Sequence, residues 1–409
     1  MSGFLSAVRS GRAQELHSIL ELYKLRGNTP SLEDVHCALL CASKAGNLQC
    51  VQHLLTVDGI DPNHKDDSGN SSLYLVVKGN HSDIVSVLCE NGASVDSIGS
   101  GNCTPLHLAA RHGFDDCLEA LLQFNCNVDA KDSTGSTALM LAVRWKQYVA
   151  ISLLLEHGCD VNARDCHGRT ALHYGCHTAV AVEKLIQAGA DVNARDADEC
   201  TPLLMAATEG LEGVVNRLCE APGIDVNIPN KGAGKTPLHI LAQKGHAKSV
   251  CRLVLSGADI NLLDTQGRSP LYYAVARSRC DVTATLLKAN GRVDTYQCPS
   301  NTSAENCPVH LAAESCLTTI LKLFILSGYD NQHVRQIVSK PNIKELFTEE
   351  MIQHWLDHAN DVSSLRHLCR MWLRHHLDVR LYSDLSKLNL PDKIREYILM
   401  SELDDLLLR

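Results

Sequence analysis

Apolar residues in this chain come in short clusters that polar turns separate at nearly constant intervals. The clearest cluster is Thr104-Pro105-Leu106-His107-Leu108-Ala109-Ala110. Related clusters begin at Thr137, Thr170, Thr201 and Thr236, weaker ones at Ser71, Ser269 and Cys307, and degenerate ones at Ser2 and Cys37. Successive starts are 31 to 38 residues apart, which predicts about ten repeated units running to roughly residue 330.

Each unit carries the signals of two short helices. A threonine before a proline is a helix N-cap followed by a residue whose missing N–H costs nothing at that position. A second apolar segment, such as Val182 to Ala188, ends before Gly189, a residue suited to a left-handed C-cap. Turns such as Asp132 to Gly135 and Asp165 to Gly168 then lead into the next unit. The repeat region is therefore predicted to be all-α.

The repeat resembles the ankyrin repeat, both in its Thr-Pro-Leu-His starts and in unit ends such as Gly189-Ala190-Asp191-Val192-Asn193. One helix pair cannot bury its own apolar face, so the units are expected to stack into a solenoid with end caps. The resemblance implies that the residues after the Ala-Ala of each first helix line the concave face. These are Arg111-His112, Arg144-Trp145, His177-Thr178, Thr208-Glu209 and Gln243-Lys244.

The residues predicted to bind a target protein are Arg111, His112, Arg144, Trp145 and Lys146, and the last three are the strongest candidates. Aromatic residues and arginines dominate interface hot spots, and these cations suit an acidic patch on the target. The alternative is that the same residues form an ordinary solvated repeat face.

The repeat signal stops after Tyr329, and residues 331–361 are predicted to be a helical connector. Ser364 then precedes a segment in which Leu365, Cys369 and Leu373 lie at i, i+4 and i+8, so that they form one apolar stripe of a helix. Neighbouring apolar residues widen the stripe to about half of the helix circumference, more than one packing neighbour needs. One side of this helix is therefore available to a partner.

Residues 362–409 resemble the SOCS box, a three-helix module. Ser364, Leu365, Cys369 and Leu373 match its elongin-binding pattern, and the resemblance implies elongin C contacts at Leu365, Leu368, Cys369, Trp372 and Leu373. It also implies cullin contacts at Leu388, Leu390, Pro391, Ile394 and Tyr397. The usual Leu-Pro-Leu-Pro of the cullin segment reads Leu388-Asn389-Leu390-Pro391 here, and asparagine orders the backbone less than proline does.

An ankyrin array over residues 1–330, a connector over 331–361 and a box over 362–409 together resemble the ankyrin repeat and SOCS box family. The resemblance implies a substrate-recognition subunit. The box would recruit elongin B, elongin C and cullin-5 with its RING subunit, while the repeats hold an unknown protein for ubiquitination and proteasomal degradation. No catalysis, cofactor or metal is expected in the chain itself. The alternative is a non-catalytic ankyrin scaffold or signalling adaptor whose box is only structural.

Composition narrows the classes of partner. The 409 residues carry 38 Lys and Arg against 47 Asp and Glu, a net charge of −9, which argues against nucleic-acid binding. No window approaches the ~20 apolar residues of a membrane helix, and the N-terminus lacks a signal-peptide core. We expect a protein of the cytoplasm, with the nucleus as a second compartment, whose 18 cysteines are reduced thiols.

Two local patterns suggest other chemistry. Gly232-Ala233-Gly234-Lys235-Thr236 resembles part of a phosphate loop, but Pro229 replaces the required first glycine. The cysteines and histidines between Cys166 and His177 lack the paired spacing of a zinc site. Both segments are explained better as ordinary parts of the repeat, and no Gly-x-Ser-x-Gly nucleophile motif occurs.

Overall fold

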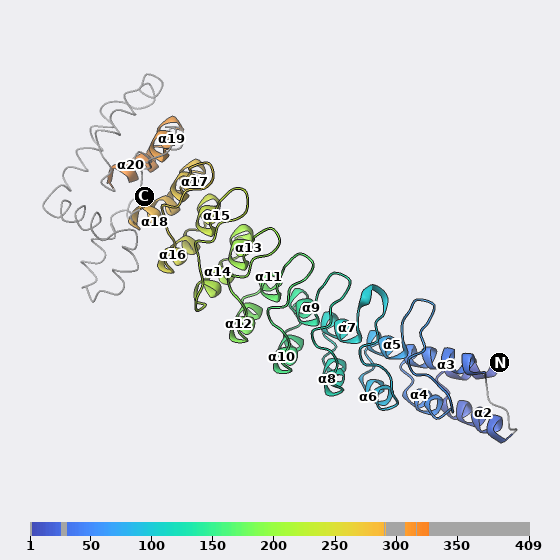
Figure 1. Ribbon diagram of the computed structural model, residues 1–409. Helices are drawn as coiled ribbons and strands as arrows, with labels where there is room; N and C mark the ends of the chain where they lie inside the picture. Colours follow the sequence, from blue (N-terminus) through green and yellow to red (C-terminus); the bar gives the residue numbers. More distant parts are fainter. Residues whose placement is uncertain (1, 26–30, 290, 292–306, 316, 327–409) are drawn as a thin grey trace. The chain divides into compact units, whose positions relative to one another are not determined.

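The computed structural model describes residues 2–25, 31–289, 291, 307–315 and 317–326 (Figure 1). Within these ranges the chain forms twenty α-helices and one short 3-10 helix, and its only β pairing is an isolated antiparallel bridge between Lys65 and Ser71. The helices follow one another in pairs, one pair for each predicted repeat. The predicted all-α array of about ten units is confirmed.

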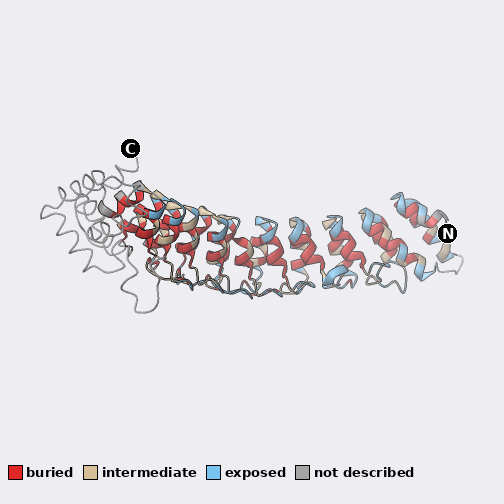
Figure 2. Ribbon diagram, turned by 90° about the horizontal axis from the view of Figure 1, so that it is seen from above, coloured by how far each residue is buried: buried red, intermediate tan, exposed pale blue. Residues whose placement is uncertain are grey.

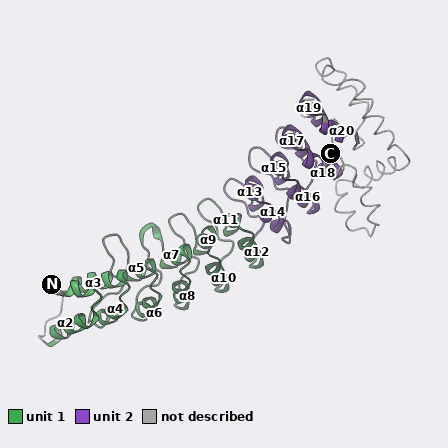
Figure 3. Ribbon diagram, turned by 180° about the vertical axis from the view of Figure 1, so that it is seen from behind, with its two compact units in different colours: residues 1–191 green, residues 192–409 purple. Residues whose placement is uncertain are grey.

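The chain divides into two compact units, residues 1–191 and 192–409 (Figure 3). The helices of the first unit are α1 (Ser2–Arg9), α2 (Ala13–Leu25), α3 (Leu32–Ala45), α4 (Leu48–Leu55), α5 (Ser72–Lys78), α6 (Ser82–Glu90), η1 (Ser100–Asn102), α7 (Pro105–His112), α8 (Asp115–Gln123), α9 (Ala138–Arg144), α10 (Tyr148–Glu156), α11 (Ala171–Gly175) and α12 (Ala179–Gln187). The described helices of the second unit are α13 (Pro202–Glu209), α14 (Glu212–Cys219), α15 (Pro237–Lys244), α16 (Ala247–Leu255), α17 (Pro270–Ala276), α18 (Cys280–Lys288), α19 (Pro308–Glu314) and α20 (Thr318–Leu326).

Within each unit the helices form two layers. In the first unit the odd-numbered helices α1 to α11 contact one another in succession, and the even-numbered helices α2 to α12 do the same (Figure 1). In the second unit α13 to α19 and α14 to α20 repeat this arrangement. Within a unit, each helix pair therefore packs against its sequence neighbours, as expected for an ankyrin stack.

The core of each unit lies between the layers and between successive pairs (Figure 2). Leu106 and Ala110 of α7 and Leu118 and Leu121 of α8 are at most 1% exposed. Helices of seven to nine residues are too short to be stable alone in water. Burial of each aliphatic side chain, worth roughly 1.5–3 kcal/mol, stabilises them through their neighbours.

The predicted helix signals act as expected. Thr201 has an extended backbone, Pro202 takes the first helical position of α13, and the Thr201 hydroxyl oxygen accepts the N–H of Leu204 at 3.2 Å. Gly210 then ends the helix in the left-handed conformation, with φ 77°. Gly189 has φ 85° after α12, although that helix begins at Ala179 and not at the predicted Val182.

The first helix, α1, begins at Ser2, where the first unit is predicted to start. The predicted start of the second unit is wrong, because helix α3 begins at Leu32 and Cys37 lies inside it. Cys37 has no threonine–proline pair to begin a helix there. The first turn of α3 instead contains Glu33 and Asp34, whose negative charges stabilise a helix N-terminus.

The shortest repeat interval corresponds to a shortened helix. Thr170 and Thr201 are 31 residues apart, and the helix that follows Thr170, α11, has only five residues. The other described first helices from α5 to α17 have seven or eight residues.

Among the described helices none is both long and apolar enough to cross a membrane.

Candidate functional site

Buried histidines connect neighbouring repeats. The His107 ring Nδ1 lies 3.2 Å from the Thr104 backbone nitrogen, and its Nε2 lies 3.0 Å from the Ser136 carbonyl oxygen of the next repeat. His239 makes the same pair of contacts to its own repeat and to the next one. Because a backbone N–H can only donate, Nδ1 must accept, and the neutral ring donates its Nε2 proton.

This arrangement excludes His107 and His239 as candidates for catalysis or ligand binding. Both rings are completely buried, and burial lowers the pKa of His107 and lowers the pKa of His239 to about 4. Protonation would place a proton on Nδ1, opposite the threonine N–H, and the hydrogen bond between them would be lost. The histidines of this pattern therefore act as neutral structural connectors.

The Asp-x-Asn ends of the repeats also form bridges. The Asn227 side-chain oxygen accepts the N–H of Asp259 at 2.7 Å, and its amide group donates to the Gly257 carbonyl at 3.3 Å. Asn63, Asn162 and Asn193 make equivalent pairs of bonds to the repeat that follows each of them. These asparagines set the spacing of the stack and are not available as ligands.

The predicted target-binding residues lie at the ends of α7 and α9 in the first unit. Arg111 and Arg144 are exposed, and Trp145 is 49% exposed. The Arg111 guanidinium carbon lies 5.1 Å from the centroid of the Trp145 ring. The Arg144 guanidinium carbon lies 5.7 Å from the centroid of Tyr174 in the next repeat. Cation–π contacts therefore join three successive repeats on this surface.

His112 and Lys146 are not part of these contacts. The His112 ring stacks on Phe114, with centroids 5.4 Å apart. Lys146 is exposed and has φ 61°, in the turn position that Gly113 occupies after α7. The structure thus joins Arg111 to Trp145 and Arg144 to Tyr174, while a role of all five residues in target binding stays a prediction.

Three exposed apolar residues near the starts of α10 and α12 carry no signal in the repeat motif. Tyr148 and Val149, at the start of α10, are 38% and 55% exposed, and Val180 near the start of α12 is 52% exposed. The available signal was the residue type at the start of the helix. Helices α8 and α14 begin with an acid, Asp115 and Glu212, where α10 has Tyr148.

The cysteine and histidine side chains between Cys166 and His177 do not gather at one site. Cys166 and His177 are exposed, whereas His173 is completely buried and contacts Thr170 through Nδ1. Among the described residues no group of three potential ligands is placed to hold a metal ion.

Two cysteines outside this segment are also unsuited to catalysis. Burial raises the pKa of the Cys117 thiol to about 11 and of the Cys159 thiol to about 12, so both are protonated at neutral pH and poorly nucleophilic.

The backbone N–H groups of the glycine-rich turn before α15 donate to acceptors within the same turn. The Lys235 N–H donates to the Asn230 side-chain oxygen at 2.7 Å, and the Gly234 N–H donates to the Asn230 carbonyl at 3.2 Å. The Ala233 N–H donates to the Lys231 carbonyl at 3.1 Å. A phosphate loop needs such groups to face a ligand, so this geometry does not support nucleotide binding.

The residues predicted to contact the ligase lie outside the described part of the structure. These are the elongin set from Leu365 to Leu373 and the cullin set from Leu388 to Tyr397, together with the connector of residues 331–361. The boundary near residue 330 also lies there. The domain boundaries and the residue assignments of the box therefore stay predictions.

Two family models match the chain. A model described as ankyrin repeats (3 copies) matches residues 6–98, 38–132, 96–165, 164–230, 203–297 and 238–337, and together these matches cover most of the chain. A model described as SOCS box matches residues 361–399. The second match contains Leu365, Cys369 and Leu373.

Curated relatives match shorter stretches. Ankyrin repeat and SOCS box protein 9 of Mus musculus is 25% identical over 164 residues, which are 40% of this chain and 54% of that protein. Ankyrin repeat and SOCS box protein 5 of Oryctolagus cuniculus is 26% identical over 164 residues, 40% of this chain and 48% of that protein. Alpha-latrotoxin-Lg1a of Latrodectus geometricus is 42% identical over 76 residues, 18% of this chain and 6% of the toxin.

The chain thus spans about half the length of the two curated relatives that share both modules, and only a small part of the toxin. The toxin match covers too little of either protein to indicate more than similar repeats. A helical repeat stack, family matches to both modules in the expected order, and relatives that carry both modules lead to one conclusion: this chain belongs to the ankyrin repeat and SOCS box family.

Proposed function

We propose that the protein is the substrate-recognition subunit of a ubiquitin ligase built on elongin B, elongin C and cullin-5 with its RING subunit. The observation that carries the proposal is the SOCS box match at residues 361–399 directly after a stack of ankyrin repeats. The box would tether the ligase and the repeats would hold the target, which raises the effective concentration of one near the other. The chain itself would perform no covalent chemistry.

The first experiment tests elongin recruitment. The full chain is co-expressed with elongin B and elongin C and analysed by size exclusion, beside a variant with Leu365→Ala and Cys369→Ala. We expect an equimolar complex that the variant loses, because truncation removes apolar area from the predicted stripe.

A matched control uses the same helix. Arg370→Ala with Arg374→Ala also truncates two residues four apart, but at 100° per residue both lie away from the stripe. This control should keep the complex. A native chain that elutes without the elongins would contradict the proposal and favour an ankyrin scaffold with a structural box.

The cullin segment allows a gain-of-affinity test. Asn389→Pro restores the proline of the usual Leu-Pro-Leu-Pro sequence and restricts the backbone before binding. We expect the elongin-bound variant to bind cullin-5 several-fold more tightly than the native chain in a titration. Equal or weaker binding would mean that Leu388 to Pro391 does not contact the cullin as the family resemblance implies.

We propose that the target binds where Arg111, Arg144 and Trp145 lie exposed. Proximity labelling in cells would compare the native chain with an Arg111→Glu, Arg144→Glu variant. Lys231→Glu with Lys248→Glu is the matched control, since both lysines are exposed and the charge change is equal. Proteins labelled by the native chain and the control, but not by the variant, are the expected targets. Identical labelling by all three would place the target elsewhere.

We further propose that this complex works in the cytoplasm, with a nuclear fraction. The support is the composition of the chain alone. Fractionation of cells that express the full chain, with elongin C followed in the same fractions, tests the compartment. Recovery of the chain in a secretory or membrane fraction would contradict it.

A further inference from the structure

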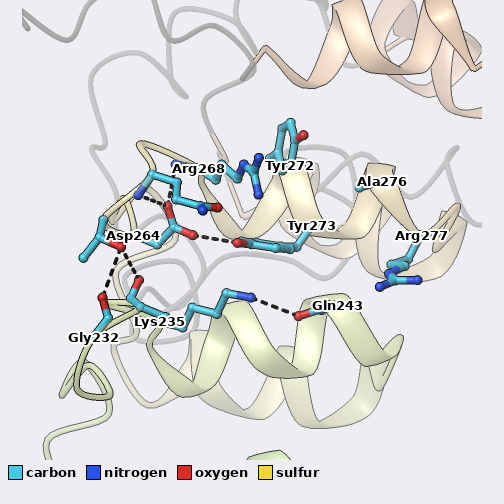
Figure 4. A pocket seen from close by; sticks show the side chains of 12 residues that line it. Gly232, Lys235, Gln243, Asp264, Arg268, Tyr272, Tyr273, Ala276 and Arg277 are labelled. Atoms are coloured by element: carbon cyan, nitrogen blue, oxygen red, sulfur yellow. Dashed lines mark hydrogen bonds between the residues drawn. The ribbon is translucent and has the colours of Figure 1, made fainter. Parts of the chain in front are cut away.

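The second unit contains a hollow that no sequence motif indicates. It lies between the turn at Gly232, helix α15 and helix α17, and its volume is about 660 Å³ (Figure 4). A second hollow of about 610 Å³ adjoins it and shares Lys235, Gln243 and Arg277 with it. We call the two together the basic groove, defined by Lys235, Lys244, Arg268, Tyr272, Arg277 and Arg279.

The charge of the basic groove is opposite to that of the chain. Five lysines and arginines line it in a protein of net charge −9. Asp264 is the only acid among the described residues that line it. Its carboxylate is 7% exposed and accepts the Tyr273 hydroxyl at 2.6 Å and the backbone N–H of Gln266 and of Arg268, each at 2.9 Å. Asp264 is therefore bonded within its own turn and helix.

The cations of the groove are largely without carboxylate partners. In the part of the chain that the structure describes, Lys235, Lys244, Arg277 and Arg279 form no ion pair. Lys244, Arg277 and Arg279 are exposed. Cations that cluster on one surface without acids create a positive potential, which attracts a partner of opposite charge.

Two of the cations are held in place by aromatic rings. The Lys235 ammonium nitrogen lies 4.1 Å from the centroid of Tyr273 and 3.3 Å from the Gln243 side-chain oxygen (Figure 4). The Arg268 guanidinium carbon lies 5.1 Å from the centroid of Tyr272. Because these contacts position the cations before binding, less conformational entropy is lost when a ligand arrives.

The groove arises from unusual residues at repeat positions. Tyr272 takes the place that His239 holds in the preceding repeat, so a half-buried phenol ring replaces a buried imidazole. Lys235 and Arg268 both precede the capping residue of a first helix, a position that Arg169 also holds and where Cys103, Ser136 and Cys200 stand in other repeats. Two consecutive repeats thus present a cation at the same position.

The shape and charge favour an acidic peptide among anionic ligands. Two adjoining hollows have room for several side chains of an extended segment. The turn N–H groups are already bonded within the turn, as described above, so a compact phosphate cradle is absent there. A nucleic acid is disfavoured because the rest of the chain is acidic and would repel a phosphate backbone.

We propose that the basic groove binds a segment of a partner protein rich in aspartate and glutamate. This inference rests on the proposed function, in that the segment belongs to the protein presented for ubiquitination and is a different part of it from the one that contacts Arg111, Arg144 and Trp145. Carboxylates of the segment would pair with Arg277, Lys244 and Arg279, while the half-buried Tyr272 contacts its apolar parts.

The test measures binding of a fluorescein-labelled peptide of alternating glutamate and glycine to the full chain by fluorescence anisotropy. A peptide with glutamine in place of glutamate is the neutral probe. We expect the acidic peptide to bind about tenfold more tightly or better, and added salt to weaken its binding. Arg277→Glu with Lys244→Glu should weaken that binding by about tenfold or more.

The control variant is Lys248→Glu with Lys78→Glu, since both lysines are exposed and lie outside the groove. It should keep the native affinity, and equal melting temperatures would show that the variants are folded. Absent binding, equal binding of both peptides, or equal loss in the control would overturn the proposal. Displacement of the peptide by duplex DNA at equal charge concentration would also overturn it, because the groove would then be a general polyanion site.

The same samples separate the two proposals. Co-elution of each variant with elongin B and elongin C reports on the box alone. If the native chain binds elongins but not the acidic peptide, the groove proposal fails and the proposed function stands. If the native chain binds the peptide but not the elongins, the proposed function fails and the binding of acidic segments by the groove stands.

Discussion

At the scale of single residues, buried imidazoles link the stability of the stack to pH. His239 must be neutral to accept from Thr236 and donate to the Arg268 carbonyl at the same time. Its pKa is about 4 in the folded chain against 6.5 in the unfolded one. The unfolded chain therefore binds the proton first, and stability rises with pH between these two values.

We expect the free energy of unfolding to be undiminished by this group above pH 6.5 and to fall as the pH drops towards 4. Between pH values above 6.5 and below 4, this ring alone should change the free energy of unfolding by about 3 kcal/mol. Urea titrations at several pH values would measure it. His239→Leu, the residue that the preceding repeat has at Leu204, should reduce the pH dependence, whereas His112→Leu on the surface should not. An unchanged pH profile in the His239 variant would contradict this prediction.

Lys146 is a second residue with a measurable energetic cost. Its φ of 61° lies in the left-handed region, which costs a residue with a β-carbon roughly 1–2 kcal/mol. Lys146→Gly should relieve this strain and raise the free energy of unfolding by about 0.5–1 kcal/mol after the entropy of glycine is subtracted. Thermal melting would detect the change. Lys131→Gly, at a position without positive φ, is the control and should not stabilise the chain.

At the scale of elements, the short helices depend on bridges to the next repeat. Asn227 supplies two such bonds, to Gly257 and to Asp259, and thereby joins the segment that follows α14 to the segment that follows α16. The same geometry recurs at three other asparagines in the two units. Side-chain bridges of this kind therefore help to set the spacing between repeats.

Asn227→Ala should lower the free energy of unfolding by about 1–3 kcal/mol, because it removes two bonds and leaves backbone groups with fewer partners. Chemical denaturation of the full chain would measure this. Asn91→Ala removes one bond inside a single repeat, from its amide to the Val87 carbonyl, and should cost less. A larger loss in the Asn91 variant would show that bridging between repeats is not the source of the effect.

At the scale of the whole molecule, each repeat is stabilised by its neighbours. Helices α1 and α2 contact α3 and α4, so the first pair covers apolar surface of the second. Leu39 of α3 and Leu54 of α4 are at most 1% exposed in the intact chain. Interactions of this nearest-neighbour kind allow part of a stack to stay folded when an end is removed.

Removal of residues 1–30 should therefore leave the remaining helices folded but make the chain self-associate. Circular dichroism per residue should stay close to that of the full chain, while light scattering at equal concentration should show larger particles. The full chain is the reference for both measurements. Loss of the helical signal throughout would mean that the stack folds only as one unit.

Part of the fold and of the candidate surfaces could be predicted from local sequence alone. Threonine caps, the proline of α13 and the left-handed Gly210 act within a few residues, so their effect can be deduced without neighbours. The start at Cys37 could not, because the helix there begins further upstream with acids in its first turn. The exposed Tyr148 and Val149 were missed because an apolar residue at a helix start can equally be buried.

The sequence by itself determined the repeat period, the paired helices, the order of array and box, and family membership, since periodicity and short motifs encode these properties. Only the tertiary structure decided that Arg111 lies over Trp145, that Lys235 lies over Tyr273, and that cations from successive repeats surround one groove. These residues are about one repeat apart in the chain. Their contacts depend on how neighbouring repeats pack and on side-chain rotamers, neither of which a local pattern specifies.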